Sequence, residues 1–494
     1  MGQMRFQVFP TGSITEGMVQ QAYLAGVDRV SWPTRTSLED ECLVLQRSVS
    51  DSGNLHVPWP VEGHGQVMLS TGSLMERPEP YQLPLELARG VLAQLRNQLS
   101  EWQMAGLTVS STVAGKVAEA VGQFSQAVVT QSDVAVSSRW AGGALRAGLD
   151  AANLLAAAYA EQAWAVRRHN GGSLNSYVGA DLGTALLDDH SARQFLQSFN
   201  AAQVPICWRD TEATEENLSW TTSDRQITWC RSHALKVLAG PLLMLASQAL
   251  PDWLCLFDDD FESLFHCVSA FVRAAVNRYR GAVDGWICAG RVNTTEALAI
   301  SEQEELQLVA RSVEMIHTLD PGTPVMVSFD QPWAEYMSRR YSDFPPLHFA
   351  DVLARANIGL SGVMLEVNLG YYPGGTLPRH PLEFSRQLDM WGLLGLPIWL
   401  SISVPSGFHY DPLAQHKVSL PPGSWSPEAQ REWVAQFVPL MLAKPMVQGV
   451  LWNQLRDSVP HEFPHGGLFD ARQQAKPALH ALASLRQHLR QPDA

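Results

Sequence analysis

The sequence has no block of basic residues. Its 494 residues include 35 Lys and Arg against 49 Asp and Glu, which gives a formal net charge of −14. Nucleic acids and anionic membranes attract clustered positive charge, so we expect neither as a partner. Charged residues make up only 17% of the chain and hydrophobic residues 46%, a balance that excludes intrinsic disorder and favours a large folded core.

Long hydrophobic runs are also missing. No stretch approaches the roughly 20 apolar residues of a membrane-spanning helix. The opening segment, MGQMRFQVFPTGS, has no apolar run long enough for a signal peptide. We therefore expect a soluble, cytoplasmic protein.

Cysteine is scarce and scattered. The six residues form no Cys-x-x-Cys pair, so they indicate buried thiols in a reducing compartment and no zinc or redox motif. His461 and His465 lie four residues apart, but the prolines around them exclude the regular helix that would align two metal ligands. We expect no metal and no cofactor.

The first third of the chain contains two kinds of segment. Residues 1–80 carry short strand-like pieces such as ECLVLQRSV and NLHVPWPV, separated by turn residues, and predict a β-rich, sandwich-like domain. Residues 81–170 place apolar residues at helical spacing with almost no β-branched runs, and predict a helical segment.

Residues 171–494 alternate short apolar strands with amphipathic helices. The predicted strands are YVGADLG, AQVPICWRD, LKVLAGPLL, VDGWICAG, PVMVSFDQP, LSGVMLEVN, LPIWLSISVP and VQGVLWNQL. Eight β-α units over this length predict a (β/α)8 TIM barrel. An open doubly wound sheet is the alternative, but no Gly-x-Gly-x-x-Gly follows the first strand to support it.

The C-terminal ends of the predicted strands carry hydrogen-bonding side chains beside aromatic rings. Active sites of such barrels lie at these ends. Sugars need donors and acceptors for their hydroxyls and flat rings for their apolar faces. We therefore expect an oligo- or polysaccharide partner. The candidate substrate-binding residues are Asp181, Trp208, Arg209, Arg291, Asn293, Gln331, Trp333, Asn368, Tyr371, Trp452, Asn453 and Arg456.

Four segments resemble glycoside hydrolase family 10, the xylanase family. The closing segment VQGVLWNQLRDSVPHEFPHGGLFDARQQAKPALHAL is similar to that family's last strand and helix. FNAAQVPICWRDTEATEENLSW, HALKVLAGPLL and LGLPIWLSISVPSG resemble its second, third and seventh strand regions. The resemblance covers about residues 177–488, and the first 170 residues match nothing in that family. It implies a TIM barrel that acts on β-linked, xylan-type saccharides.

The sequence departs from the family at both catalytic positions. The resemblance implies a glutamate acid/base after strand four and a glutamate nucleophile on strand seven. Gly290 and Arg291 stand where the family has Asn-Glu, and Ile402 stands where it has the nucleophile. Neither Arg nor Ile can donate a proton or attack as a carboxylate does. The usual mechanism therefore cannot be carried over.

Two other carboxylates could replace the missing pair. Glu366 takes the Gln position, and Asn368 the His position, of the family's "GLQGH" pattern on strand six. Asp330 ends the preceding predicted strand, and neighbouring strands lie about 4.8 Å apart. We hypothesise that Asp330 and Glu366 are a relocated catalytic pair, with Arg291 holding one of them as the anion. The structural alternative is that Glu366 is a buried acid paired with Arg291.

Three functions remain open at this point. The first is a glycoside-hydrolase-like protein for β-linked saccharides with a non-standard catalytic site, and the second is a catalytically inactive saccharide-binding or scaffold protein. The third is an interaction protein whose first 170 residues do the work. Carboxylates facing each other across a cleft favour the enzyme, and a barrel mouth filled by an ion-paired arginine favours the inactive barrel.

Overall fold

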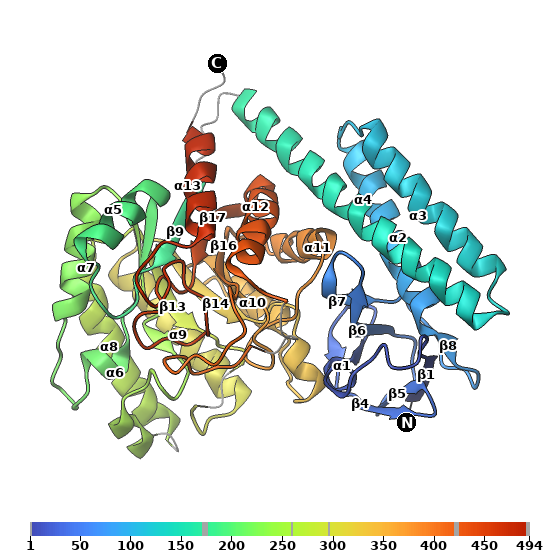
Figure 1. The fold of residues 1–494 in the computed structure, drawn as a ribbon. Coiled ribbons are helices and arrows are strands. Elements are labelled where there is room, and N and C mark those ends of the chain that lie inside the picture. The colour runs from blue at the N-terminus through green and yellow to red at the C-terminus, as the bar shows by residue number, and fades with distance from the viewer. Residues whose placement is uncertain (1, 170–175, 258–259, 295–296, 419–423, 491–494) are drawn as a thin grey trace. The chain divides into compact units, whose positions relative to one another are not determined.

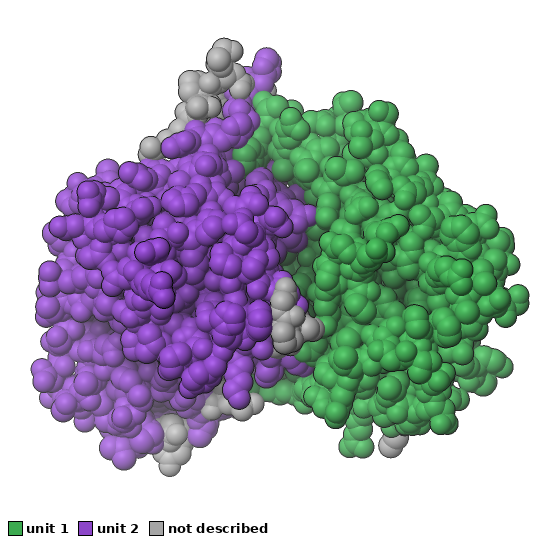
Figure 2. Space-filling view, viewed as in Figure 1, with its two compact units in different colours: residues 1–166, 333–342, 377–387 green, residues 167–332, 343–376, 388–494 purple. Residues whose placement is uncertain are grey.

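The computed structural model describes residues 2–169, 176–257, 260–294, 297–418 and 424–490. The chain divides into two compact units, coloured separately in Figure 2. Unit 1 comprises Met1–Val166, Trp333–Ser342 and Leu377–Gln387, and unit 2 comprises Arg167–Pro332, Asp343–Thr376 and Leu388–Ala494. The predicted boundary at 170/171 lies outside the described residues. Among the described helices, none combines the length and apolarity needed to cross a membrane.

Unit 1 contains two four-stranded sheets, as the strand-rich pattern of residues 1–80 predicts. One has the order β4-β5-β1-β8 and the other β3-β2-β6-β7. The elements are β1 (Gly2–Gln7), α1 (Glu16–Gln21), β2 (Tyr23–Ala25), β3 (Ser31–Trp32), β4 (Arg35–Glu39), β5 (Cys42–Arg47), β6 (Asn54–Val61), β7 (Gly65–Ser70) and β8 (Tyr81–Gln82). Neighbouring strands are antiparallel, except β1 and β8, which are parallel.

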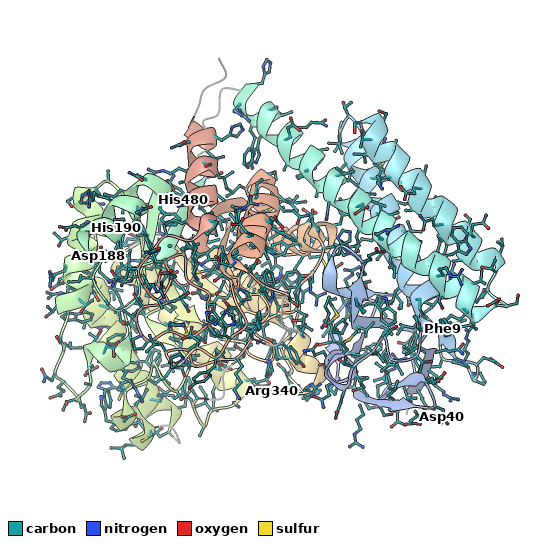
Figure 3. All side chains as sticks on the ribbon, in the orientation of Figure 1. Phe9, Asp40, Asp188, His190, Arg340 and His480 are labelled. Carbon is teal, nitrogen blue, oxygen red and sulfur yellow. The ribbon has the colours of Figure 1, made fainter. Side chains whose placement is uncertain are left out.

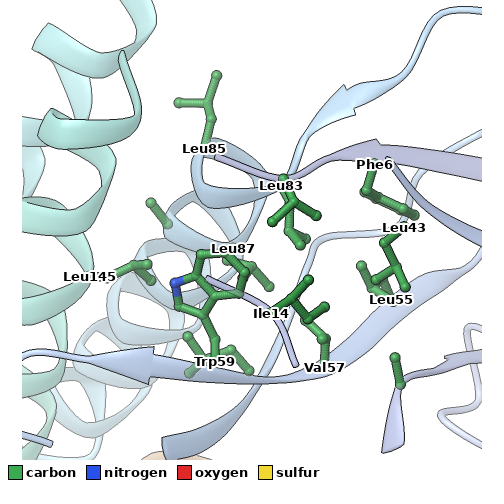
Figure 4. Close-up of a cluster of buried hydrophobic side chains, with 14 of the residues drawn as sticks. Phe6, Ile14, Leu43, Leu55, Val57, Trp59, Leu83, Leu85, Leu87 and Leu145 are labelled. Carbon is green, nitrogen blue, oxygen red and sulfur yellow. The ribbon is translucent and has the colours of Figure 1, made fainter. Parts of the chain in front are cut away.

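Three helices complete the continuous part of unit 1. They are α2 (Leu83–Met104), α3 (Ser111–Val129) and α4 (Val134–His169). The Ser110 hydroxyl caps α3 by accepting a hydrogen bond from the Val113 N–H at 3.3 Å. Their apolar faces share one core with the sheets, in which Trp59 of β6 lies among Leu87 of α2 and Leu145 of α4 (Figure 4). The predicted division at residue 80 therefore separates two kinds of secondary structure but not two cores.

Two segments that follow barrel strands also belong to unit 1. The first includes the short helix η2 (Glu335–Ser338), and the second includes the start of α11 (Pro381–Gly392). Arg379 of the second segment forms an ion pair with Glu335 of the first and donates a hydrogen bond to the Tyr23 hydroxyl at 3.1 Å. The side chains of this ion pair are each 1% exposed, so these contacts lie inside the unit.

Unit 2 is a closed barrel of parallel strands, which confirms the predicted (β/α)8 fold. Its strands are β9 (Tyr177–Asp181), β10 (Ala201–Val204), β11 (Lys236–Ala239), β12 (Leu243–Met244), β13 (Gly285–Gly290), β14 (Val325–Asp330), β15 (Leu360–Asn368), β16 (Ile398–Ser403) and β17 (Val447–Trp452). β9 pairs with both β10 and β17, and β11 pairs with β13 to close the ring. The third predicted strand is interrupted at Gly240, whose φ is +118° and whose added Cβ would lie 2.3 Å from the Ile287 carbonyl oxygen.

Helices surround these strands (Figure 1). They are α5 (Asp189–Ser198), α6 (Trp208–Thr211), α7 (Thr221–Ser232), η1 (Asp252–Leu256), α8 (Phe261–Tyr279), α9 (Glu302–Leu319), α10 (Pro346–Arg355), α11, α12 (Pro427–Ala443) and α13 (Pro477–Arg490). Asp188 caps α5 by accepting from the His190 N–H at 2.9 Å, and both residues are labelled in Figure 3. The predicted strand AQVPICWRD is wrong at its end, because β10 stops at Val204 and Trp208 begins α6.

The cysteines are only partly buried, which corrects the expectation that all six are. Cys42, Cys230 and Cys288 are buried, whereas Cys255 is exposed. Burial raises the pKa of Cys230 to about 12, so this thiol is held in its neutral form.

Candidate functional site

A cavity of about 350 Å³ opens at the C-terminal ends of the barrel strands. Asp181 ends β9, Glu366 lies near the end of β15, and Arg291 and Asn453 follow β13 and β17 directly. All four side chains line this cavity, together with the loop that leads to Phe463. Small-molecule sites span about 300–1,000 Å³, so the cavity suits a small ligand. Its place in the barrel is where active sites of this fold lie.

Glu366 is held by two side chains. Arg291 Nε donates to its Oε2 at 3.0 Å, and the Ser328 hydroxyl donates to its Oε1 at 3.0 Å. The residue is 4% exposed. A charged donor and a hydroxyl therefore satisfy the two oxygens of this buried carboxylate.

Arg291 also pairs with a second carboxylate, Glu462. Its Nη2 lies 2.8 Å from Glu462 Oε2, and its Nη1 contacts Oε1 as well. Burial lowers the pKa of Arg291, but Glu366 and Glu462 raise it well above the usual value, so the guanidinium stays charged. Arg291 itself adopts a left-handed backbone conformation, with φ of 58°, immediately after β13.

The sequence did not identify Glu462 as a site residue. Burial raises the pKa of Glu462, whereas Arg291 and a hydrogen bond from His416 lower it, and the result is about 2. The His416 Nε2 lies 3.1 Å from Glu462 Oε1, and its ring stacks on Phe463 at 5.3 Å. The sequence does carry one signal for Glu462. It is an acid in the loop after the last strand, and loops at that end of a barrel reach the site.

Asp181 has a different environment from Glu366. Its Oδ1 accepts a hydrogen bond from the Gly183 N–H at 2.6 Å. Burial raises the pKa of Asp181, the Gly183 hydrogen bond lowers it and the charge of Glu366 raises it, giving about 7. Near neutral pH a substantial share of Asp181 is therefore the uncharged acid.

Asp330 lies beside Glu366 in the sheet but outside the cavity wall. The two residues are partners in the β14–β15 register. The Asp330 carboxylate accepts from Gln331 Nε2 at 3.1 Å and from Asn368 Nδ2 at 3.4 Å. Burial raises its pKa, Arg291 lowers it and Glu366 raises it, to about 7. Within the described residues, the cavity lining includes Glu366 and not Asp330, so their catalytic pairing stays a prediction.

The other predicted site residues fall into separate groups. Asp181, Arg291, Asn453 and Arg456 line the cavity with Glu366. Asn453 Nδ2 donates to Asn368 Oδ1 at 3.0 Å, and the Asn293 amide pairs with the backbone N–H and carbonyl of Asp330. These contacts form a polar network behind the cavity wall. Arg456 donates to the backbone carbonyl of Leu186 at 3.0 Å, so it also anchors the chain after β9.

Several of the predicted sugar-contacting residues make packing contacts, and their role in binding stays a prediction. Trp208, Tyr371 and Trp452 are fully buried. Trp208 stacks on Phe271 at 4.8 Å, and Trp452 donates its indole N–H to the Gly466 carbonyl at 2.8 Å. Arg209 pairs with Asp252.

Trp333 belongs to unit 1. There the Arg379 guanidinium lies 4.8 Å from its ring centroid. Among the described residues, no group of three or more His, Cys, Asp or Glu is arranged to hold a metal ion.

Comparison with known proteins supports the fold. No protein-family model matches the sequence, and no curated protein matches it either. Xylanase 10B of Thermotoga petrophila RKU-1, solved in complex with xylobiose, superposes with a TM-score of 0.50 and 16% identity over 64% of this chain and 95% of that chain. Xylanase 10B of Thermotoga maritima superposes with a TM-score of 0.49 and 16% identity over 65% of this chain and 98% of that chain. At 16% identity the likeness to the Thermotoga petrophila enzyme shows the fold alone, a barrel like that of family 10 glycoside hydrolases.

Proposed function

We propose that this protein is carbohydrate-active and binds a short β-linked saccharide of the xylan type in the barrel cavity. The supporting observation is a small cavity walled by donors and acceptors from different strands, among them Asp181, Glu366 and Asn453. Sugar hydroxyls require such a mixture, and Met364 and Phe463 add apolar surface for the faces of a sugar ring.

One cavity residue offers an unused hydrogen-bonding group. Gln203 on β10 donates through Nε2 to the Gly240 carbonyl at 3.3 Å. Its Oε1 is buried and has no hydrogen-bond partner within the described part of the chain. Buried acceptors are rarely left unsatisfied. A ligand hydroxyl that donates to Gln203 Oε1 would supply the missing bond.

Binding is the part of the function that the geometry supports best. Arg291 lies between Glu366 and Glu462. This is the ion-paired arrangement that favours a barrel without the usual family 10 chemistry. Hydrolysis would need a proton donor on the cavity wall, and that question is separate from binding.

Calorimetry on the full-length protein tests the proposal. The ligands are xylo-, cello- and manno-oligosaccharides of two to four units. We expect saturable binding of at least one series, and Asn453→Ala should weaken it about fivefold by removing a cavity-wall amide, since a net hydrogen bond is worth roughly 1 kcal/mol.

The matched control is Asp40→Asn. Asp40 is exposed in the β4–β5 turn with φ of 47°, a conformation that Asn also tolerates, and it is labelled in Figure 3. It should leave affinity unchanged. Absence of heat and of any shift in melting temperature with all three series would refute saccharide binding in the barrel and direct attention to unit 1.

A further inference from the structure

Two carboxyl groups on the cavity wall have opposite environments. Asp181 and Glu366 both line the cavity, from β9 and β15 respectively. Resting on the proposed saccharide binding, we infer that Asp181 is the proton donor, and Glu366 the proton-accepting carboxylate, of a glycosidic-bond hydrolysis. This pair differs from the Asp330–Glu366 pair that the sequence predicts.

The contacts of Asp181 suit an acid. In the described part of the chain no Lys or Arg pairs with its carboxyl group, which accepts the Gly183 N–H through Oδ1. The residue is 9% exposed. A carboxyl group that is shielded from water, close to another carboxylate and without a cationic partner keeps its proton more readily than a solvated one. Its other oxygen is free to carry that proton towards a ligand.

The contacts of Glu366 suit the partner role. Arg291 donates to one of its oxygens and Ser328 to the other, so a positive charge faces this carboxylate, in contrast to Asp181. Each carboxylate oxygen has a further lone pair with which it can accept a proton from water. General acid–base catalysis needs two such groups whose environments separate their protonation states.

The reaction balances with one water molecule. The Asp181 carboxyl proton moves to the glycosidic oxygen as the bond from the anomeric carbon to that oxygen breaks, and the bonding electron pair goes to the oxygen. Water oxygen forms the new bond to the anomeric carbon, and a water proton moves to Glu366. Solvent then returns a proton to Asp181 and removes one from Glu366. Because water attacks directly, the product anomer is inverted.

Leaving-group dependence separates a proton donor from a structural residue. A nitrophenolate leaves without protonation, whereas a sugar alkoxide does not. Asp181→Asn should therefore reduce cleavage of the bound oligosaccharides by about 10²–10⁴-fold, the usual contribution of a general acid. It should leave cleavage of nitrophenyl β-xyloside, β-glucoside or β-mannoside within about tenfold of the unsubstituted protein.

Glu366→Gln should impair cleavage of both substrate classes, because water activation is needed for each. In the unsubstituted protein, oligosaccharide cleavage should decline as pH rises through about 7, where Asp181 loses its proton, and Asp40→Asn should keep that profile. Thermal melting of each variant confirms that it is folded.

The outcomes distinguish this inference from the proposed function. Saccharide binding and the proton-donor role of Asp181 are both supported if the protein binds and cleaves oligosaccharides and Asp181→Asn selectively reduces that cleavage. Binding without cleavage overturns the assignment of Asp181 and leaves saccharide binding intact. The same holds if Asp181→Asn lowers the cleavage of both substrate classes by the same factor. No binding of any series overturns both. Retention of the anomeric configuration in the product refutes the direct attack by water.

Discussion

Arg291 Nε lies 3.0 Å from Glu366 Oε2, so a cation from the fourth barrel strand region directly neutralises the acid of the sixth. The same guanidinium pairs with Glu462 from the loop after β17. Arg291, directly after β13, therefore binds two carboxylates. Its guanidinium supplies the positive charge that both carboxylates share at the barrel mouth.

Removal of this cation should destabilise the barrel. Arg291→Met leaves Glu366 and Glu462 without their shared partner, and breaking a buried ion pair costs about 3–5 kcal/mol. Urea denaturation measures the free energy of unfolding. The control is Arg311→Met, which breaks the exposed pair with Glu262 and should cost no more than about 1 kcal/mol. Equal losses of unfolding free energy for the two variants would contradict a stabilising role for the ion pairs of Arg291 with Glu366 and Glu462.

Asp181 should make stability fall with rising pH. Its usual pKa is 3.8 and its folded pKa is about 7. Between these values the unfolded chain has lost the proton that the folded chain keeps, so unfolding releases a proton and higher pH favours it. The free energy of unfolding should fall by up to about 1.4 kcal/mol per pH unit in this range.

Asp181→Asn removes this dependence. The difference in unfolding free energy, variant minus unsubstituted protein, should therefore rise between about pH 4 and pH 7 and level off outside that window. Urea titrations at several pH values measure it, with Asp40→Asn expected to give a flat difference. If the difference for Asp181→Asn is also independent of pH, folding does not raise the pKa of the Asp181 carboxyl group.

Loss of one partner of the buried Arg379–Glu335 ion pair in unit 1 should destabilise the protein more than loss of both partners. Arg379→Met leaves Glu335 without this partner in a site where both side chains are 1% exposed, and we expect a loss of about 3–5 kcal/mol. The double variant Arg379→Met, Glu335→Leu should recover most of it, because neither member of this ion pair is left buried without the other. Thermal unfolding reports both. Arg146→Met, at an exposed pair with Glu62, is the control and should change little.

Thiol labelling should reveal one rapidly reacting cysteine. Cys255 is exposed, Cys207 and Cys267 are half-buried, and the other three are buried. Burial raises the pKa of Cys207 to about 11, which keeps it largely as the less reactive thiol. A colorimetric thiol reagent should label one site quickly in the folded protein and all six in denaturant. Cys255→Ser should abolish the fast phase, and Cys288→Ser should not.

The sequence predicted the barrel because that information is local. Period-two and helical spacing repeat along residues 177–490, and each strand or helix bears its own pattern. The positions of Arg291, Asp330 and Glu366 at strand ends followed from the same patterns. Trp208 was misplaced because a buried apolar run does not distinguish the end of a strand from the short helix that follows it.

The composition of the site depended on tertiary structure. Whether Asp181 or Asp330 reaches the cavity is determined by how strands distant in sequence close the ring, and no local pattern encodes it. Glu462 joins Arg291 across 171 residues of chain. Sequence alone thus determined the barrel and the strand ends that carry its polar groups. Only the folded structure decided which carboxylates face the cavity and which are paired, because burial and charge pairing arise from contacts between remote segments.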